Sequence, residues 1–155
     1  MKGYTSETIR NVALVGHGGC GKTTFLESAL LATGVIDRLG KVEDGNTVSD
    51  YDKMEIEKGF SINTSIVPVE WKGDKINFID TPGYFDFIGE VNAALRASEA
   101  AVILVDAGAG IQVGTEHAWK ACERYKMPRF IVINKRDKDE FDFYKTFDEL
   151  KAKFG

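Results

Sequence analysis

The sequence predicts an α/β protein in which a mostly parallel sheet lies between two layers of helices. Two continuous apolar runs, 101–105 and 130–133, are typical of parallel strands, because such strands are buried on both faces. Segments of helical length alternate with the apolar runs along the chain. Three runs are followed directly by motifs that contain glycine or aspartate. These motifs should therefore meet at the carboxyl edge of the sheet, where folds of this class bind their ligands.

The individual elements follow from this alternation. Strands are predicted near 10–16, 62–70, 75–80, 101–106 and 129–134. Helices are predicted at 22–33, 88–98, 113–125 and 140–153. The polar segment 34–60 is too long for a routine connection, and its charged, glycine-containing composition argues against packing of its own. We therefore expect a long loop there.

Length and composition limit the kind of protein. The 155 residues suffice for one domain with a sizeable core. A net charge of −4 gives no general attraction to nucleic acid, so we expect no sequence-specific nucleic-acid partner. No apolar run approaches the length that spans a bilayer, and the first residues lack a hydrophobic signal core. We therefore expect a cytoplasmic protein with no membrane partner, in which Cys20 and Cys122 are reduced thiols.

The first motif begins at the end of the strand predicted near 10–16. It fits the pattern GxxxxGK[ST] and comprises Gly16, His17, Gly18, Gly19, Cys20, Gly21, Lys22 and Thr23. Glycines let such a loop curl until its N–H groups point at phosphate oxygens, while the lysine reaches the β- and γ-phosphates and the threonine hydroxyl binds Mg2+. We assign this loop and the adjacent Thr24 to a nucleoside triphosphate. The alternative is a strand-to-helix turn in which the glycines are present for steric reasons only.

The second motif, Asp80-Thr81-Pro82-Gly83, follows the strand-like run 76–79. A carboxylate at this strand end can hold the Mg2+ shell beside the phosphate loop. Gly83 leaves its N–H unhindered, so it can sense whether a γ-phosphate is present. The alternative is an ordinary turn built from aspartate, proline and glycine.

The third motif, Asn134-Lys135-Arg136-Asp137, follows the run 130–133. An aspartate carboxylate can accept two hydrogen bonds from guanine N1–H and the exocyclic amine, whereas adenine offers no such pair of donors. Asp137 therefore selects GTP and GDP, and it argues against the alternative of an ATP-using P-loop enzyme. Alone, the string could be a solvated charge cluster. Three motifs in this order, each at a strand end, favour a nucleotide site.

These residues resemble the translational GTPases, and most closely the N-terminal G domain of bacterial elongation factor G and its ribosomal-protection and release-factor relatives. The narrower similarity begins with Gly16-His17 at the start of the loop. Residues 57–62 resemble the switch I segment E-R-G-I-T-I, and residues 80–87 resemble D-T-P-G-H-x-D-F. The stretch 90–112 is similar to the family's helix and strand after switch II.

The resemblance implies the three-layer fold of a P-loop NTPase with the strand order of a GTPase. Residues 1–155 would then be a partial translational-GTPase G domain that lacks the final strand and helix and belongs to a longer protein. Its parts would be the phosphate loop 16–23, switch I at about 34–62, switch II at about 80–90 and the base-recognition motif 134–137. The run 130–133 would form an exposed sheet edge, through which the fragment can self-associate.

The resemblance also implies roles for individual residues. Thr23, Ser61 and Asp80 would surround Mg2+, with Ser61 in place of a family threonine. Asn134 would tie the base site to the phosphate loop, and the stem of Lys135 would cover one face of the base. The ribosome would be the partner of the full-length protein, and we expect it to stimulate GTP hydrolysis.

Catalysis is assigned to Lys22, Gly83 and Tyr84. Tyr84 stands where the family has the histidine that positions the hydrolytic water. A tyrosine hydroxyl can orient water, but with an ordinary pKa of about 10 it supplies no positive charge at neutral pH. The alternative is a ring that only packs beside switch II. The predicted function is GTP hydrolysis, and the alternative is a nucleotide-gated binding module with little hydrolysis.

Two further departures from the family lie close by. Relatives commonly carry valine or isoleucine at the place of Gly18 and isoleucine at the place of Phe60. We expect Phe60 to fill the space opened at Gly18 and to make room for Tyr84. Without a triphosphate, we expect residues from about 38 to 60 to be disordered or variably placed.

Overall fold

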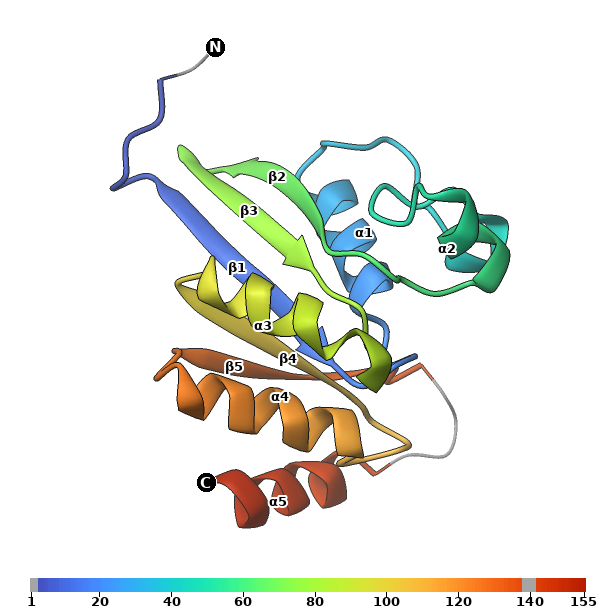
Figure 1. The fold of residues 1–155 in the computed structure, drawn as a ribbon, viewed down its shortest axis with the longest axis vertical. Coiled ribbons are helices and arrows are strands. Elements are labelled where there is room, and N and C mark those ends of the chain that lie inside the picture. Colours follow the sequence, from blue (N-terminus) through green and yellow to red (C-terminus); the bar gives the residue numbers. More distant parts are fainter. Residues whose placement is uncertain (1–2, 138–141) are drawn as a thin grey trace.

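In the computed structural model, which describes residues 3–137 and 142–155, a five-stranded sheet separates helices on its two faces (Figure 1). The strands are β1 (Ile9–Gly16), β2 (Ser65–Trp71), β3 (Asp74–Asp80), β4 (Ala100–Asp106) and β5 (Arg129–Asn134). Their order is β2-β3-β1-β4-β5. Strand β2 runs antiparallel to β3, and the other neighbouring pairs are parallel. The predicted three-layer, mostly parallel fold is confirmed.

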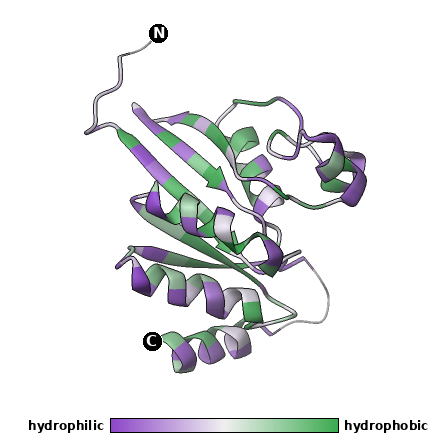
Figure 2. Cartoon of the chain, in the orientation of Figure 1, coloured by the Kyte–Doolittle hydropathy of each residue, from purple (hydrophilic) through white to green (hydrophobic). Residues whose placement is uncertain are grey.

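Four longer helices cover the sheet: α1 (Lys22–Ala32), α3 (Ile88–Arg96), α4 (Val113–Arg124) and α5 (Phe143–Phe154). Helix α1 packs on one face, where Leu26 and Leu30 join a buried apolar cluster with the strands. Helices α3, α4 and α5 pack on the other face through side chains that include Leu95, Cys122 and Leu150. Figure 2 shows the apolar residues concentrated along the strands and polar residues on the outer helix surfaces. Burial on both faces explains the continuous apolar runs of the sequence.

The segment 34–60 carries structure that the sequence analysis did not predict. It contains a short 3-10 helix, η1 (Val42–Asp44), and helix α2 (Lys53–Lys58). Asp52 begins α2 with a capping box, because its carboxylate accepts from the Met54 N–H at 2.8 Å and its own N–H donates to Glu55 at 3.3 Å. Gly59, at a φ of 70°, ends the helix. The expectation of a loop without packing of its own is therefore wrong, since these local signals outweigh the polar composition.

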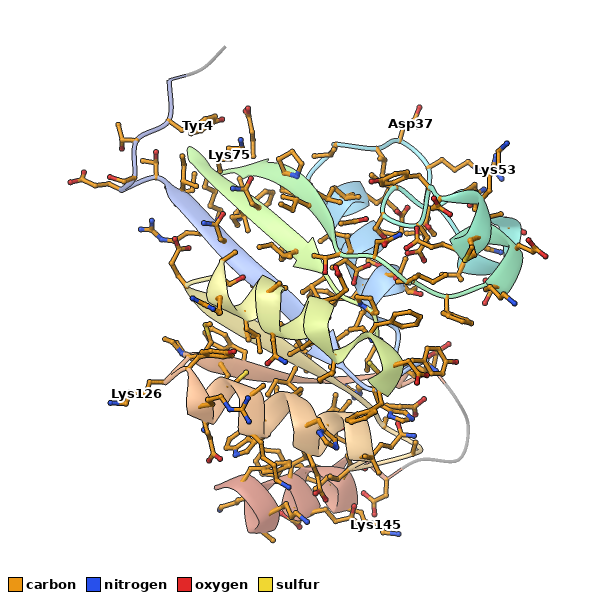
Figure 3. All side chains as sticks on the ribbon, viewed as in Figure 1. Tyr4, Asp37, Lys53, Lys75, Lys126 and Lys145 are labelled. Atoms are coloured by element: carbon orange, nitrogen blue, oxygen red, sulfur yellow. The ribbon has the colours of Figure 1, made fainter. Side chains whose placement is uncertain are left out.

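The same segment lies beside α1, with Asp37 and Lys53 on its outer side (Figure 3). Several of its polar residues are buried: Thr47, Ser49, Asp50 and Glu55. Whether residues 38–60 change place when a triphosphate leaves stays a prediction.

Three element boundaries also differ from the predicted ones by two residues or more. The strand predicted at 62–70 begins only at Ser65. The helix predicted at 88–98 ends at Arg96 and is preceded by a 3-10 turn, η2 (Phe85–Phe87). The helix predicted at 140–153 spans 143–154, and part of its predicted start falls outside the described residues.

Strand β5 forms one edge of the sheet, as predicted, and Phe130 on it is 67% exposed. The expected self-association through this edge is not borne out. Among the described helices, none combines the length and the apolar character needed to cross a bilayer.

Candidate nucleotide-binding site

The phosphate loop joins the end of β1 to the start of α1. Gly21, immediately before the helix, has a φ of 92°, which favours glycine. A Cβ at Gly21 would also overlap the side-chain nitrogen of Asn134. That nitrogen donates to the Cys20 carbonyl at 3.0 Å. The loop and the third motif are therefore in direct contact.

The side chain of Lys22, the first residue of α1, extends back to the start of the phosphate loop. Its side chain is nearly buried, and its Nζ donates to the carbonyls of Gly16 at 3.3 Å and His17 at 3.1 Å. Gly83 packs against the same amine, since a Cβ at Gly83 would overlap Nζ and lie 2.7 Å from Gly18. The first and second motifs thus enclose the ammonium group that the sequence assigns to phosphate.

A cluster of hydroxyls and carboxylates lies beside Lys22. Thr23 Oγ1 donates to Asp80 Oδ2 at 2.9 Å and lies 3.3 Å from Ser61 Oγ. Ser49 Oγ donates to the same Asp80 oxygen at 3.0 Å. The structure therefore brings together Thr23, Ser61 and Asp80, the three residues predicted to surround Mg2+.

Two carboxylates in this cluster are buried, and each has an oxygen without a hydrogen bond from the described residues. Asp80 is 0% exposed, and burial raises the pKa of its carboxyl to about 6 against the opposing effects of Lys22, Thr23 and Ser49. Burial also raises the pKa of the Asp50 carboxyl, and a hydrogen bond with Ser61 acts in the opposite direction. Asp80 Oδ1 and Asp50 Oδ2 find no hydrogen-bond partner among the described residues. Unpaired buried carboxylate oxygens fit a site that a hard divalent cation completes.

Ser49 and Asp50 were missed by the sequence analysis, because they belong to no recognised motif and lie in a segment that was predicted to be a plain loop. The pattern of Asp52 followed by Glu55 is a capping-box signal, and it could have indicated α2 just after them. No local signal points to Ser49, whose contact with Asp80 joins residues 31 positions apart.

The position of Tyr84 differs from the packing expected around Gly18. A Cβ added to Gly18 would lie 3.2 Å from the Tyr84 ring, so the tyrosine itself covers Gly18. Phe60 packs against that ring, with centroids 4.7 Å apart and planes tilted by 59°. Phe60 therefore does not fill the space at Gly18 as expected. The volume missing from Gly18 is taken up by the larger side chain at position 84.

A cavity of about 220 Å3 lies where these parts meet. Its lining comprises Gly18, Gly19, Gly21, Lys22, Thr23, Thr24, Val42, Glu43, Asp50, Gly59, Phe60, Ser61, Gly83, Tyr84 and Lys135. Lys135 is held there by an ion pair with Asp106 at 2.9 Å. Asp137 is exposed and is not part of the lining.

Four predicted residues face elsewhere. The hydroxyl of Thr81 is buried and donates to the Leu14 carbonyl at 2.6 Å, so it binds the backbone of β1. Cys20 is buried beneath the loop, and burial raises the pKa of its thiol. The His17 ring accepts the Gly114 N–H of α4 at 3.2 Å, and with Pro82 it lines a second cavity of about 260 Å3. His17 therefore does not line the cavity beside Lys22, and its carbonyl accepts from the Lys22 amine.

Comparison with known proteins agrees with this geometry. Residues 7–155 match the family model described as the elongation factor Tu GTP-binding domain. The chain is 46% identical over 147 residues to elongation factor G of Granulibacter bethesdensis, covering 95% of this chain and 21% of that protein. It is 39% identical over 152 residues to the mitochondrial ribosome-releasing factor 2 of Drosophila willistoni, covering 98% of this chain and 20% of that protein.

A crystal structure of a protein from Thermus thermophilus superposes with a TM-score of 0.92 at 42% identity. The match covers 96% of this chain and 22% of that one. The chain thus spans about a fifth of the length of the relatives it matches. It belongs to the family of elongation factor Tu GTP-binding domains, as a guanine-nucleotide-binding domain similar to that of elongation factor G.

Proposed function

We propose that this domain hydrolyses GTP as the G domain of an elongation factor G-like translation factor that works on the ribosome in the cytoplasm. One observation carries the proposal: residues of the phosphate loop, Gly83 of the second motif and Lys135 of the third motif line one cavity, in a chain of this family. The ribosome is proposed as the partner because of the relatives, one of which is named a ribosome-releasing factor.

The phosphate end of GTP is assigned to Lys22, the loop N–H groups and the N–H of Gly83. Mg2+ is assigned to the hydroxyls of Thr23 and Ser61, with Asp80 supporting its shell and Asp50 facing the same space. When bound, Mg2+ neutralises charge that develops on the phosphates during transfer. The unpartnered oxygens of the two buried aspartates support this assignment.

The base end is assigned to Asn134, Lys135 and Asp137. The bond from Asn134 to the Cys20 carbonyl supports a role in joining the base site to the phosphate loop. The ion pair with Asp106 holds the Lys135 stem beside the cavity. Asp137 would accept from guanine, and its side chain is exposed to solvent.

Tyr84 is assigned to orienting the attacking water. Its ring contacts Gly18 and Phe60, and the side chain remains 45% exposed, so its hydroxyl can reach solvent at the cavity. A hydroxyl can position water, but it supplies no positive charge to the transition state. Hydrolysis should therefore depend strongly on the ribosome.

The experiment is single-turnover GTP hydrolysis with and without ribosomes, for the unchanged protein and for Tyr84→Phe and Tyr84→His. Phenylalanine keeps the packing against Gly18 but loses the hydroxyl, so we expect about a tenfold or greater loss, as for removal of a positioned catalytic group. Equal rates for the unchanged protein and Tyr84→Phe would show that the ring only packs. Absence of ribosome-stimulated turnover in the unchanged protein would favour the nucleotide-gated module, which the family comparisons do not favour.

A further inference from the structure

We infer that Glu55 and Glu90 are positioning residues that hold Ser61 in place by binding the backbone that follows it. The inference rests on the proposed Mg2+ role of Ser61. Glu55 lies on α2 and Glu90 on α3, so the two carboxylates come from different helices. We call residues 62–64 the clamped segment.

Each of the three N–H groups of the clamped segment donates to one of these carboxylates. Ile62 and Asn63 donate to the same Glu55 oxygen, both at 2.9 Å. Thr64 donates to Glu90 at 3.0 Å. Strand β2 starts only at Ser65, so the carboxylates satisfy backbone groups that the sheet does not reach.

The burial of Glu55 makes this contact specific. The side chain is 2% exposed, and its hydrogen-bond donors are the N–H groups of Asp52, Ile62 and Asn63. Within the described ranges, no lysine, arginine or histidine forms an ion pair with it. A buried carboxylate compensated only by backbone N–H groups requires those groups to stay in place, because its charge is costly when left unpaired.

The clamped segment lies one peptide bond from the site. Ser61 directly precedes it, and the Ser61 hydroxyl lies 3.3 Å from that of Thr23. A shift of the clamped segment would therefore move Ser61 away from Thr23 and Asp80. Because Glu90 is on the helix that follows the Asp80 motif, movement of α3 would also reach Ser61 through Thr64.

The test compares Glu55→Ala, Glu55→Gln and the matched control Glu57→Ala. Alanine removes the acceptor, glutamine keeps one carbonyl oxygen, and Glu57 is an exposed glutamate of the same helix. The measurement is the Mg2+ concentration that half-saturates binding of a non-hydrolysable GTP analogue, with GDP in parallel. GDP lacks the γ-phosphate that orders switch I, so its binding should change little.

For Glu55→Ala we expect the Mg2+ requirement with the GTP analogue to rise by about tenfold, as for loss of hydrogen bonds to a charged group. Glu55→Gln should recover most of the loss, and Glu57→Ala should match the unchanged protein. Equal rises with the GTP analogue and GDP would show general destabilisation and would overturn the inference.

Ser61→Ala separates this inference from the proposed metal site. If Ser61→Ala leaves the Mg2+ requirement unchanged, the metal role of Ser61 is wrong, and the inference that rests on it falls too. If Ser61→Ala raises the requirement while Glu55→Ala does not, the metal role stands and the positioning role is overturned.

Amide hydrogen exchange without nucleotide gives a second readout. Glu55→Ala should speed exchange at Ile62 and Asn63, and unchanged exchange there would contradict the clamp. Should Glu55→Ala fail to fold, Glu90→Ala leaves α2 intact and tests the same inference. It should speed exchange at Thr64 and raise the Mg2+ requirement, and an unchanged requirement would overturn the inference.

Discussion

At Gly83 the chain comes so close to the phosphate loop that no side chain fits. A Cβ there would overlap Lys22 Nζ and lie 2.7 Å from both the nitrogen and the Cα of Gly18. In addition to the proposed role of its N–H in phosphate binding, glycine at this position lets the second motif pack directly against the Lys22 ammonium group and Gly18.

We expect Gly83→Ala to weaken GTP binding by about ten- to a hundredfold, because displacing Lys22 removes a hydrogen bond to a charged group, worth about 1.5–3 kcal/mol. Titration with a fluorescent GTP analogue measures this. Gly89→Ala is the matched control, since Gly89 lies nearby in the sequence, at the start of α3, and a Cβ there meets nothing within 4 Å. Equal affinities for the two variants would contradict the steric explanation.

At the scale of elements, α1 both follows the glycine-rich loop and supports residues 34–62, the segment predicted to be switch I. Glu27 on α1 is 1% exposed and accepts the N–H groups of Gly40 at 3.0 Å and Val48 at 2.6 Å. Together with Glu55 and Glu90, it is a third carboxylate that binds backbone N–H groups within or just after residues 34–62. Hydrogen bonds to glutamates therefore hold this part of the chain at several points.

We expect Glu27→Ala to lower the free energy of unfolding by about 2 kcal/mol or more, because it leaves two N–H groups without their acceptor at about 1–3 kcal/mol each. Denaturant unfolding and limited proteolysis within 38–48 measure the effect. Ser28→Ala is the control, since the Ser28 hydroxyl bonds only to Thr24 of its own helix at 2.9 Å. Unchanged proteolysis of the segment in Glu27→Ala would refute this role.

At the scale of the whole molecule, the charge of Asp80 favours metal binding but lowers the stability of the metal-free fold. Its folded-state pKa is raised to about 6, so its contribution to stability is present at low pH and is lost as the pH rises through that value. At neutral pH the metal-free fold therefore carries an unfavourable buried charge, which a bound cation would offset.

We expect Asp80→Asn to leave thermal stability in EDTA at pH 7.5 unchanged or raised, since the amide keeps an acceptor for Thr23 and Ser49 without the charge. The same substitution should lower Mg2+-dependent GTP affinity by about tenfold or more, as for loss of a charged hydrogen-bonding group. Thermal unfolding in EDTA and GTP titration in Mg2+ give the two values. Lower stability in EDTA together with unchanged affinity would be the opposite of this prediction.

Much of the candidate site could be predicted because its residues lie in motifs at strand ends. Lys22, Asp80 and Asn134 each follow an apolar run, and parallel strands bring their carboxyl ends to one edge. The contact of Glu55 with Ile62 and that of Ser49 with Asp80 could not be predicted in this way. They join residues 7 and 31 positions apart, and nothing in the local pattern indicates them.

Local patterns were sufficient for the order of the five strands and the four longer helices, the glycine-rich loop and the family resemblance, because each depends on residues close together in the chain. The folded arrangement was needed to show that Tyr84 covers Gly18 and that glutamates bind the backbone of residues 40, 48 and 62–64. Those contacts depend on which side chains and N–H groups packing leaves facing each other, and packing joins residues that are distant in the sequence.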